Sequence, residues 1–307
     1  MNRPTSVAAV VVTYNRLDKL KKVLAALEKQ TVLPSSIIVV NNASTDGTDV
    51  FLNGYRGSSA ISKRCNIKII NMENNIGGAG GFSIGMKEGY LSGADYVWVF
   101  DDDGYPEPDA LEKLLNGFSA AVRELGPDVP YACSVVMFTD GSICEMNNPV
   151  PTWDWGRLLV KGQNSVMTTS CSFVSVLFPK WVIEKYGLPY KEYFIWFDDS
   201  EYTTRITKVC PGVQVLDSVI IHDMGSNKGV NFSMIDDHNS WKFAFGIRNQ
   251  ASYRLHHEGF IKYAIFCGTV IRAMNRGKVR GRLRVKMVGK MLEAIKFNPK
   301  IEFPTNQ

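Results

Sequence analysis

Short apolar runs alternate with amphipathic stretches through the first hundred residues of the chain. The runs are rich in β-forming residues, which predicts buried strands at 6–12, 37–40, 67–70 and 97–100. Apolar positions at helical spacing lie between the runs and predict helices from Asp18 to before Pro34, over 48–55 and over about 81–91. This alternation predicts a mainly parallel, Rossmann-like α/β sheet flanked by helices, with right-handed crossovers.

The alternation continues beyond residue 104 in a less regular form. A turn and a helix start are expected at Pro106 and Pro108. Further strands are expected at 131–138, 169–178 and 213–221, and further helices at 181–186 and from Asp198. The irregular segment 146–161 contains Trp153 and Trp155, which either form a stacking platform for a sugar or anchor the loop on the core.

Polar or glycine-rich segments end the strands predicted in the first half of the chain, at 13–16, 41–48, 74–82 and 101–103. Ligands of parallel sheets bind at the carboxyl ends of the strands, so we expect these segments to converge on one crevice. The glycine-rich segment 77–81 allows a close backbone approach and offers N–H donors at a helix start. It matches neither the Walker nor the GxGxxG pattern, and a flexible turn is the alternative interpretation.

Asp101, Asp102 and Asp103 follow the run 97–100 directly. Adjacent carboxylates repel one another and are seldom buried unless a cation neutralises them. A hard divalent ion, Mn²⁺ or Mg²⁺, is the natural partner, and such an ion often carries substrate phosphates. His222, at the end of the predicted strand 213–221, is a candidate further ligand, since imidazole suits Mn²⁺ better than Ca²⁺. A solvated acidic turn and a structural histidine are the alternatives.

A second acidic cluster, formed by Asp198, Asp199 and Glu201, lies among aromatic residues. On a helix, Glu201 and Arg205 stand four positions apart and are expected to form an ion pair. Asp198 and Asp199 stand at the start of that helix, where the dipole favours the charged form and where one of them can serve as the N-cap. The other is then free to act as a general base, with a pKa raised by its apolar surroundings.

The composition is that of a globular protein, with 45% hydrophobic and 21% charged residues among 307. The net charge of +5 suits an anionic substrate or a phospholipid surface without requiring nucleic acid. The six cysteines show no CxxC or zinc spacing, which favours a reducing, cytoplasmic compartment. The run 7–12 is too short for a signal-peptide core, and no apolar run reaches the ~20 residues that span a bilayer.

The composition shifts after about residue 225, which predicts a main domain over 1–225 and a basic helical region over 226–307. Residues 272–296 carry nine cations against one acid, Glu293, and the preceding run 260–271 is apolar apart from Lys262. Two interpretations stay open: a helical tail that lies on an anionic membrane surface, and a helical appendage packed on the main domain with a solvated basic face. No recognition motif supports nucleic-acid binding.

In their order and spacing, these motifs together resemble the family 2 glycosyltransferases of the GT-A fold. The resemblance extends from Val7 to about Asn249 and rests on 11–16, 40–48, 75–82, 100–103, 196–201 and the pair Arg248-Asn249. The segment 77–82 and the triple aspartate are most similar to the galactofuranosyltransferase branch, and rhamnosyltransferases have similar motifs.

The resemblance implies an inverting, metal-dependent transfer of galactofuranose from UDP-galactofuranose to a hydroxyl of a lipid-linked glycan acceptor in cell-surface polysaccharide synthesis. Two alternatives remain, a rhamnosyltransferase that uses dTDP-rhamnose and a non-catalytic sugar-nucleotide-binding assembly partner. The basic tail is consistent with a peripheral position on the inner face of the cell membrane.

The resemblance also implies a role for individual residues. The donor nucleotide and sugar are assigned to Thr13, Tyr14, Asn15, Arg16, Asn41, Asn42, Asn75, Gly77, Gly78 and Asp102, with Asn41 and Asn42 standing where many members carry an aspartate. The metal, Mn²⁺ or Mg²⁺, is assigned to Asp101, Asp103 and His222. Asp199 corresponds to the catalytic base and Asp198 to its partner, and the candidate acceptor contacts are Trp153, Trp155 and Trp196.

Overall fold

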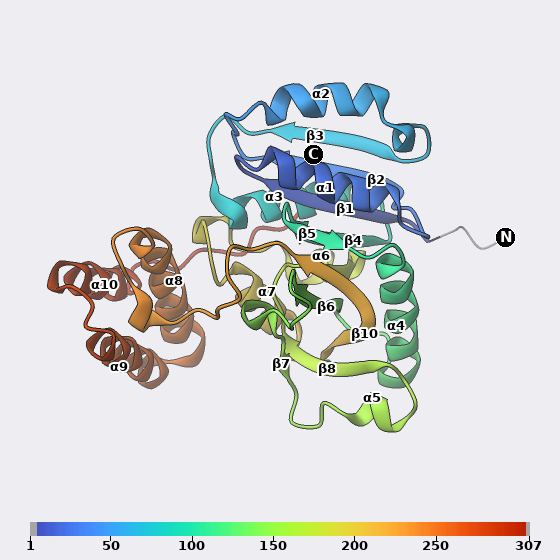
Figure 1. Ribbon diagram of the computed structural model, residues 1–307. Helices are drawn as coiled ribbons and strands as arrows, with labels where there is room; N and C mark the ends of the chain where they lie inside the picture. The colour runs from blue at the N-terminus through green and yellow to red at the C-terminus, as the bar shows by residue number, and fades with distance from the viewer. Residues whose placement is uncertain (1–4, 305–307) are drawn as a thin grey trace.

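The computed structural model describes residues 5–304, apart from the side chains of Ser58 and Ala60, so the outer ends of the two predicted domain ranges lie outside the described residues. The described strands form one sheet in the order β3-β2-β1-β4-β9-β6-β10-β8-β7, with β5 paired to β10 (Figure 1). The first four neighbours are parallel: β3 (Asn66–Asn71), β2 (Ser36–Asn41), β1 (Val7–Thr13) and β4 (Tyr96–Asp101). The predicted α/β class is confirmed.

The second half of the sheet mixes directions. β6 (Ala132–Phe138) runs parallel to β10 (Gly212–His222), and β9 (Val176–Pro179) lies antiparallel between β4 and β6. The antiparallel strands β8 (Ser165–Ser170), β7 (Val150–Pro151) and β5 (Gly104–Pro106) complete it. The two strands that bring the candidate metal ligands together are β4 and β10.

The single strand predicted over 169–178 is wrong. The chain forms β8 and β9 there, separated by a turn in which Ser175 has a φ of 63°. Both halves are apolar enough to read as one run, so the pattern did not reveal the turn. The Ser175 hydroxyl accepts a hydrogen bond of 3.0 Å from the indole N–H of Trp98, which fixes the turn against β4.

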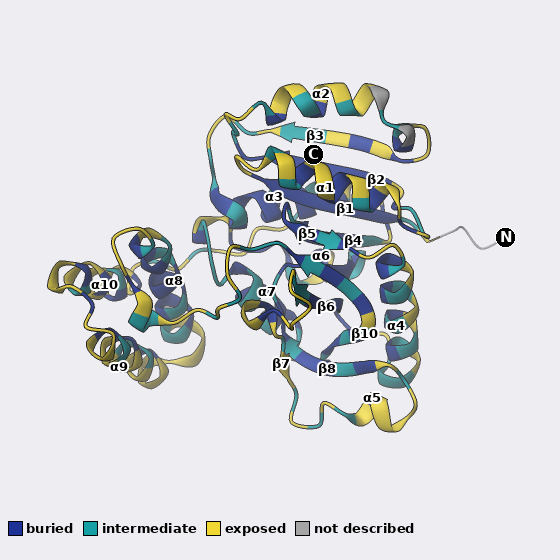
Figure 2. Ribbon diagram, viewed as in Figure 1, coloured by how far each residue is buried: buried dark blue, intermediate teal, exposed yellow. Residues whose placement is uncertain are grey.

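Helices cover both faces of the sheet, and β1 is buried at every position. Val7, Ala9 and Val11 face one core, which α1 (Leu17–Glu28), α2 (Thr48–Ser58) and α4 (Ala110–Leu125) cover. Ala8 and Val10 face the other core, which α3 (Gly77–Leu91), α6 (Lys180–Tyr186) and α7 (Asp198–Ile206) cover. Figure 2 shows β1 and β2 buried throughout. The apolar positions predicted for the first helix are confirmed as buried: Leu20, Val23, Leu24 and Leu27.

The glycine-rich segment is the first turn of α3, so both the flexible turn and the helix start near residue 81 were wrong. A Cβ on Gly81 would lie 2.4 Å from Val12, and one on Gly85 would lie 2.3 Å from Val10. These glycines let the helix lie directly on β1. Gly77 has a φ of +77°, and a Cβ there would lie 2.0 Å from the carbonyl oxygen of Phe194.

Three helices follow the sheet and form a separate small core, seen beside it in Figure 1: α8 (Ser240–Tyr253), α9 (Phe260–Arg276) and α10 (Gly281–Glu293). Their predicted helical character is confirmed, and the domain boundary near residue 225 stays a prediction. Asn249 ties α8 to the main domain by donating to the carbonyl oxygens of Tyr193 and Trp196. No helix within residues 5–304 is long and apolar enough to cross a membrane.

The remaining helical elements are short. They are α5 (Arg157–Val160), 3₁₀ turns at Ala60–Lys63, Glu145–Asn147, Lys191–Tyr193 and Phe232–Met234, and a π-helical turn at Arg254–Glu258. The six cysteines are free thiols.

Candidate active site

Asp101, Asp103 and His222 meet at the carboxyl ends of β4 and β10. One potential ligand atom from each of the three lies within 4.8 Å of the other two. Strand pairing explains the meeting, since β5 follows the triple aspartate directly and aligns Gly104 with His222. Asp102 and Asp103 keep only 3% of their surface exposed, so the alternative of a solvated acidic turn is wrong.

The ring of His222 is oriented by Asn147. His222 Nδ1 lies 2.8 Å from the side-chain oxygen of Asn147, which can only accept, so Nδ1 carries the hydrogen. His222 Nε2 then faces Asp103 Oδ1, 3.1 Å away. A lone pair and a carboxylate oxygen at that distance repel unless a proton or a cation lies between them. The two carboxylates and this imidazole therefore fit Mn²⁺ or Mg²⁺.

The carboxyl groups of the cluster differ in their pKa values. Burial, followed by the charges of Asp103 and Asp102, raises the pKa of Asp101 to about 8. Burial also raises the pKa of Asp102, although the charge of Arg16 opposes it. Burial acts in the same direction on Asp103, but His222, Arg16 and Lys19 hold its pKa below the ordinary value. Positive charge that would compensate the carboxylates is therefore lacking around Asp101 in particular.

The loop after β1 is fixed to the triple aspartate. The Thr13 hydroxyl donates to Asp102 Oδ2 over 2.8 Å, and the backbone N–H of Tyr14 donates to the same oxygen over 3.3 Å. Arg16 Nη1 lies 2.7 Å from Asp103 Oδ2 and 3.1 Å from Asp102 Oδ1. About half of the Arg16 side chain is exposed, so its guanidinium can reach a phosphate in front of the carboxylates.

The next two loops are tied to each other by asparagines. Both amide groups are buried: Asn41 binds Asn71 and the backbone N–H of Ser44, and Asn42 binds the backbone of Ile76 and Gly77. Asn75 accepts a hydrogen bond of 2.8 Å from the N–H of Gly77 and shapes the start of α3. These asparagines position the loops, and their contact with a nucleoside stays a prediction.

Asp198 and Asp199 open α7. Phe197, with a φ of 74°, takes the N-cap position and no side chain caps the helix, so the N-cap role proposed for one aspartate is wrong. Asp198 is buried and Asp199 is partly exposed. Burial raises the pKa of both carboxyl groups, and the charge of Asp199 adds to the effect on Asp198. A partly exposed carboxyl group with a raised pKa can accept a proton from a bound hydroxyl.

Glu201 and Arg205 form the predicted ion pair, with Arg205 Nε 2.9 Å from Glu201 Oε1. Arg205 also donates to the carbonyl oxygens of Tyr186 and Leu188. Because its carboxylate is buried and paired, Glu201 has a structural role in α7.

The turn between β8 and β9 connects the two acidic clusters. Asn147 donates to the Ser172 hydroxyl over 2.8 Å, which joins the turn to His222. The backbone of Phe173 donates to Asp199, and the backbone N–H of Cys171 donates to the hydroxyl of Thr203 in α7. The cation cluster and the candidate base are thus held by one short segment.

The three candidate acceptor tryptophans differ in their surroundings. Trp153 is 92% exposed and Trp155 is about half exposed, so both rings are accessible. The ring of Trp196 packs edge-on against Phe243 in α8, with ring centroids 5.0 Å apart. Trp196 thus anchors the C-terminal helices, and an acceptor contact for any of the three stays a prediction.

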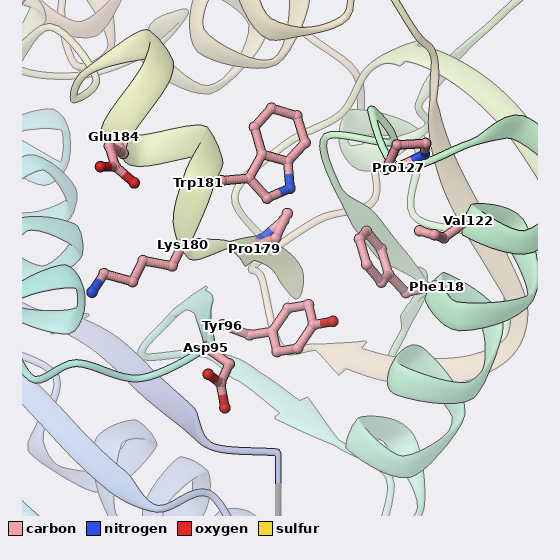
Figure 3. A pocket seen from close by; sticks show the side chains of 9 residues that line it. All are labelled: Asp95, Tyr96, Phe118, Val122, Pro127, Pro179, Lys180, Trp181 and Glu184. Atoms are coloured by element: carbon pink, nitrogen blue, oxygen red, sulfur yellow. The ribbon is translucent and has the colours of Figure 1, made fainter. Parts of the chain in front are cut away.

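A hollow of about 520 Å³ lies away from the acidic clusters (Figure 3). Asp95 and Tyr96 at the start of β4, Phe118 of α4 and Trp181 of α6 line it. Asp101 lies at the opposite end of β4, so this hollow is not the site of the predicted chemistry.

Sequence reasoning missed Asn147 and Lys242. Asn147 sits in an irregular segment with no periodic signal, and only the folded chain brings it to His222. Lys242 of α8 is half-buried, and burial and the charge of Arg16 lower its pKa, while Asp103 has the opposing effect. The C-terminal helices therefore add a cation to the edge of the cluster.

The fold is of the GT-A type, and the comparisons with known proteins agree with it. Residues 8–127 match the model of glycosyl transferase family 2. The chain is 29% identical over 229 residues to galactofuranosyltransferase GlfT1 of Mycobacterium tuberculosis, covering 73% of this chain and 72% of the relative. It is 32% identical to GlfT1 of Mycolicibacterium smegmatis, covering 44% of this chain and 42% of that protein. Residues 8–127 thus match the family 2 glycosyltransferase model, and the chain is similar to galactofuranosyltransferases.

Solved structures share the fold at low identity. S. aureus TarS 1-349 in complex with UDP-GlcNAc has a TM-score of 0.55 and 15% identity, covering 95% of this chain and 82% of that one. GalNAc-T7 with UDP, GalNAc and Mn²⁺ has a TM-score of 0.60 and 13% identity over 81% of this chain. This chain spans about half of GalNAc-T7, 47% of its length.

Proposed function

We propose that this protein transfers galactofuranose from UDP-galactofuranose to a hydroxyl of a glycan acceptor, with inversion at the anomeric carbon and with a bound divalent cation. The observation that carries the proposal is the cluster of Asp101, Asp103 and His222, which the turn between β8 and β9 connects to Asp199. The similarity to proteins named galactofuranosyltransferases supports the choice of sugar.

The donor lies across the loops that end the first strands. Tyr14, Asn15 and Arg16 are exposed at the end of β1 and face the nucleoside and the diphosphate, while Thr13 holds their loop to Asp102. The N-terminus of α3 at Gly77 and Gly78 offers backbone N–H groups to an anion. Asn41, Asn42 and Asn75 keep these loops in place for the nucleotide. Arg16, half-exposed beside the carboxylates, would pair with the diphosphate.

Asp101, Asp103 and His222 would hold Mn²⁺ or Mg²⁺, and the ion, when bound, neutralises charge on the diphosphate. Asp199 accepts the proton of the acceptor hydroxyl, whose oxygen attacks the anomeric carbon as the bond to the diphosphate breaks. UDP leaves with the bonding electron pair. Asp198 is buried beside Asp199, and burial and the charge of Asp199 raise the pKa of Asp198.

An Asn147→Ala variant is expected to bind Mn²⁺ about 10–100-fold more weakly, because His222 loses the acceptor that fixes its tautomer and ring orientation. Isothermal titration with Mn²⁺ measures the affinity directly. Asn148→Ala is the matched control, since Asn148 is the exposed neighbour and should leave the affinity unchanged. Equal Mn²⁺ affinity of the two variants would contradict the orienting role of Asn147.

The proposal also covers the acceptor and the location of the protein. We place the protein at the cytoplasmic face of the membrane with a lipid-linked glycan as acceptor, with residues 226–307 as the membrane-facing region and 1–225 as the catalytic domain. The basic composition of the C-terminal helices supports this placement. The exposed rings of Trp153 and Trp155 are available for stacking on the glycan.

A donor panel tests the function. Purified protein with Mn²⁺ is expected to release UDP from UDP-galactofuranose when a membrane extract of glycolipids supplies the acceptor. Turnover with dTDP-rhamnose alone would instead establish the rhamnosyltransferase. Nucleotide binding without turnover of either donor would favour a non-catalytic assembly partner.

A further inference from the structure

α9 and α10 each carry two apolar faces. One face of each helix packs into the small C-terminal core, through Val270 and Met274 of α9 and Leu283, Met287 and Met291 of α10. A helix that only completes such a core needs a single apolar stripe. The second face has no covering among residues 5–304, and Figure 2 shows both helices largely as exposed.

The exposed face of α10 is a regular stripe. Val285, Val288 and Leu292 follow at i, i+3 and i+7, which places them on one side of the helix, away from Leu283, Met287 and Met291, and the exposed Ile295 follows in the turn after the helix. On α9 the exposed apolar side chains are Phe260, Ile261, Ile265 and Ile271. We call these eight side chains the apolar face. Its side chains retain a large apolar surface that folding leaves in water.

Cations border the apolar face. Residues 260–296 contain ten lysines and arginines against one acid, Glu293. Arg280 and Arg282 pair with Asp237, and Lys290 pairs with Glu293. The remaining lysines and arginines of this segment form no ion pair with an acidic side chain within residues 5–304. They include Lys262, Arg272, Arg276, Lys278 and Lys296. Exposed apolar side chains bordered by unpaired cations form the pattern of a helix that lies in a membrane interface.

We propose that the apolar face of α9 and α10 docks on an anionic phospholipid surface, with Val285, Leu292, Ile261 and Ile265 entering the headgroup boundary and the bordering cations contacting lipid phosphates. The positive charge around the apolar face favours an anionic membrane over a second copy of the chain as the binding partner. A symmetric pairing would bring the same unpaired cations of two copies together, and their charges repel. The inference rests on the proposed function in one respect: docking would bring the protein to a lipid-linked acceptor.

Vesicle sedimentation tests the proposal with the full chain. The protein is expected to sediment with vesicles of equal parts phosphatidylglycerol and phosphatidylcholine, and not with phosphatidylcholine alone. Val285→Glu and Leu292→Glu are expected to weaken binding about tenfold or more, because each places an anion on the apolar face. Val209→Glu is the matched control: Val209 is 72% exposed and Val285 73%, but Val209 lies outside α9 and α10.

Failure of the membrane face can be separated from failure of the enzyme. UDP release measured without vesicles is expected to stay at the wild-type level in all three variants. A Leu292→Trp variant keeps the apolar character of the face. The fluorescence of the introduced tryptophan should shift to the blue when anionic vesicles are added. Vesicle binding of Leu292→Glu equal to that of Val209→Glu, or no blue shift, would overturn the proposal. A dimer in sedimentation velocity that Leu292→Glu dissociates, without vesicle binding by the wild type, would assign the face to a second copy instead.

Discussion

An Asp199→Asn variant is expected to lose sugar transfer by about 10²–10⁴-fold in kcat, while its affinity for UDP stays unchanged. Asparagine keeps the size of the side chain but cannot take the proton of the acceptor hydroxyl. Asp199 is partly exposed at the start of α7, and its carboxylate is not among the cation-binding groups. The loss should therefore appear in turnover and not in nucleotide binding, which a parallel UDP titration measures.

The pH profile gives an independent readout of the same residue. Burial raises the pKa of Asp199, so its carboxyl group becomes protonated at a higher pH than an ordinary aspartate as the pH falls. The acid limb of wild-type kcat should therefore lie above the ordinary carboxyl range and disappear in the residual activity of Asp199→Asn. Asp217→Asn, at an exposed position of β10, is the control and should match the wild type. Full turnover by Asp199→Asn would remove the base assignment.

An Asp103→Asn variant is expected to lower kcat/KM at least about 100-fold at a fixed Mn²⁺ concentration. The change removes the charged oxygens that face His222 Nε2 and Arg16 while keeping the side-chain size. Isothermal titration should show the corresponding loss of Mn²⁺ affinity, partly restored in activity assays by more Mn²⁺.

An Asp223→Asn variant distinguishes the effect of cation coordination from the effect of the net charge of the region. Asp223 lies next to His222 in sequence and interacts with Lys19 and Lys22, but it is outside the cation cluster. Its substitution should change Mn²⁺ affinity far less than that of Asp103. Equal effects of the two substitutions would mean that the net charge of the region, and not coordination, controls the reaction.

The residues predicted from the sequence were those whose chemistry is visible locally. Apolar periodicity identified the buried face of α1, since Leu20 and Leu24 repeat at helical spacing. The triple aspartate and His222 were found because carboxylates directly after an apolar strand require a cation. Their meeting follows from β5, whose antiparallel pairing with β10 aligns Gly104 with His222. That short strand was not predicted, because its Gly-Tyr-Pro sequence resembles a turn.

The errors have a common cause in tertiary packing. The split of 169–178 depends on Ser175, whose hydroxyl meets the indole of Trp98 from another strand. The early start of α3 depends on glycines that let the helix lie against Val10 and Val12. Asn147 is recognisable only by its 2.8 Å contact with His222, 75 positions away. No local pattern contains such a partner, so these features follow from the fold alone.

Diffraction from crystals that contain Mn²⁺ and UDP, recorded with the anomalous signal of manganese, tests the central claim most directly. We predict one manganese peak in bonding contact with the carboxylates of Asp101 and Asp103 and with His222 Nε2, with the diphosphate of UDP on the same ion. A manganese peak away from these three side chains, or UDP bound at the hollow beside Trp181, would contradict the proposed reaction.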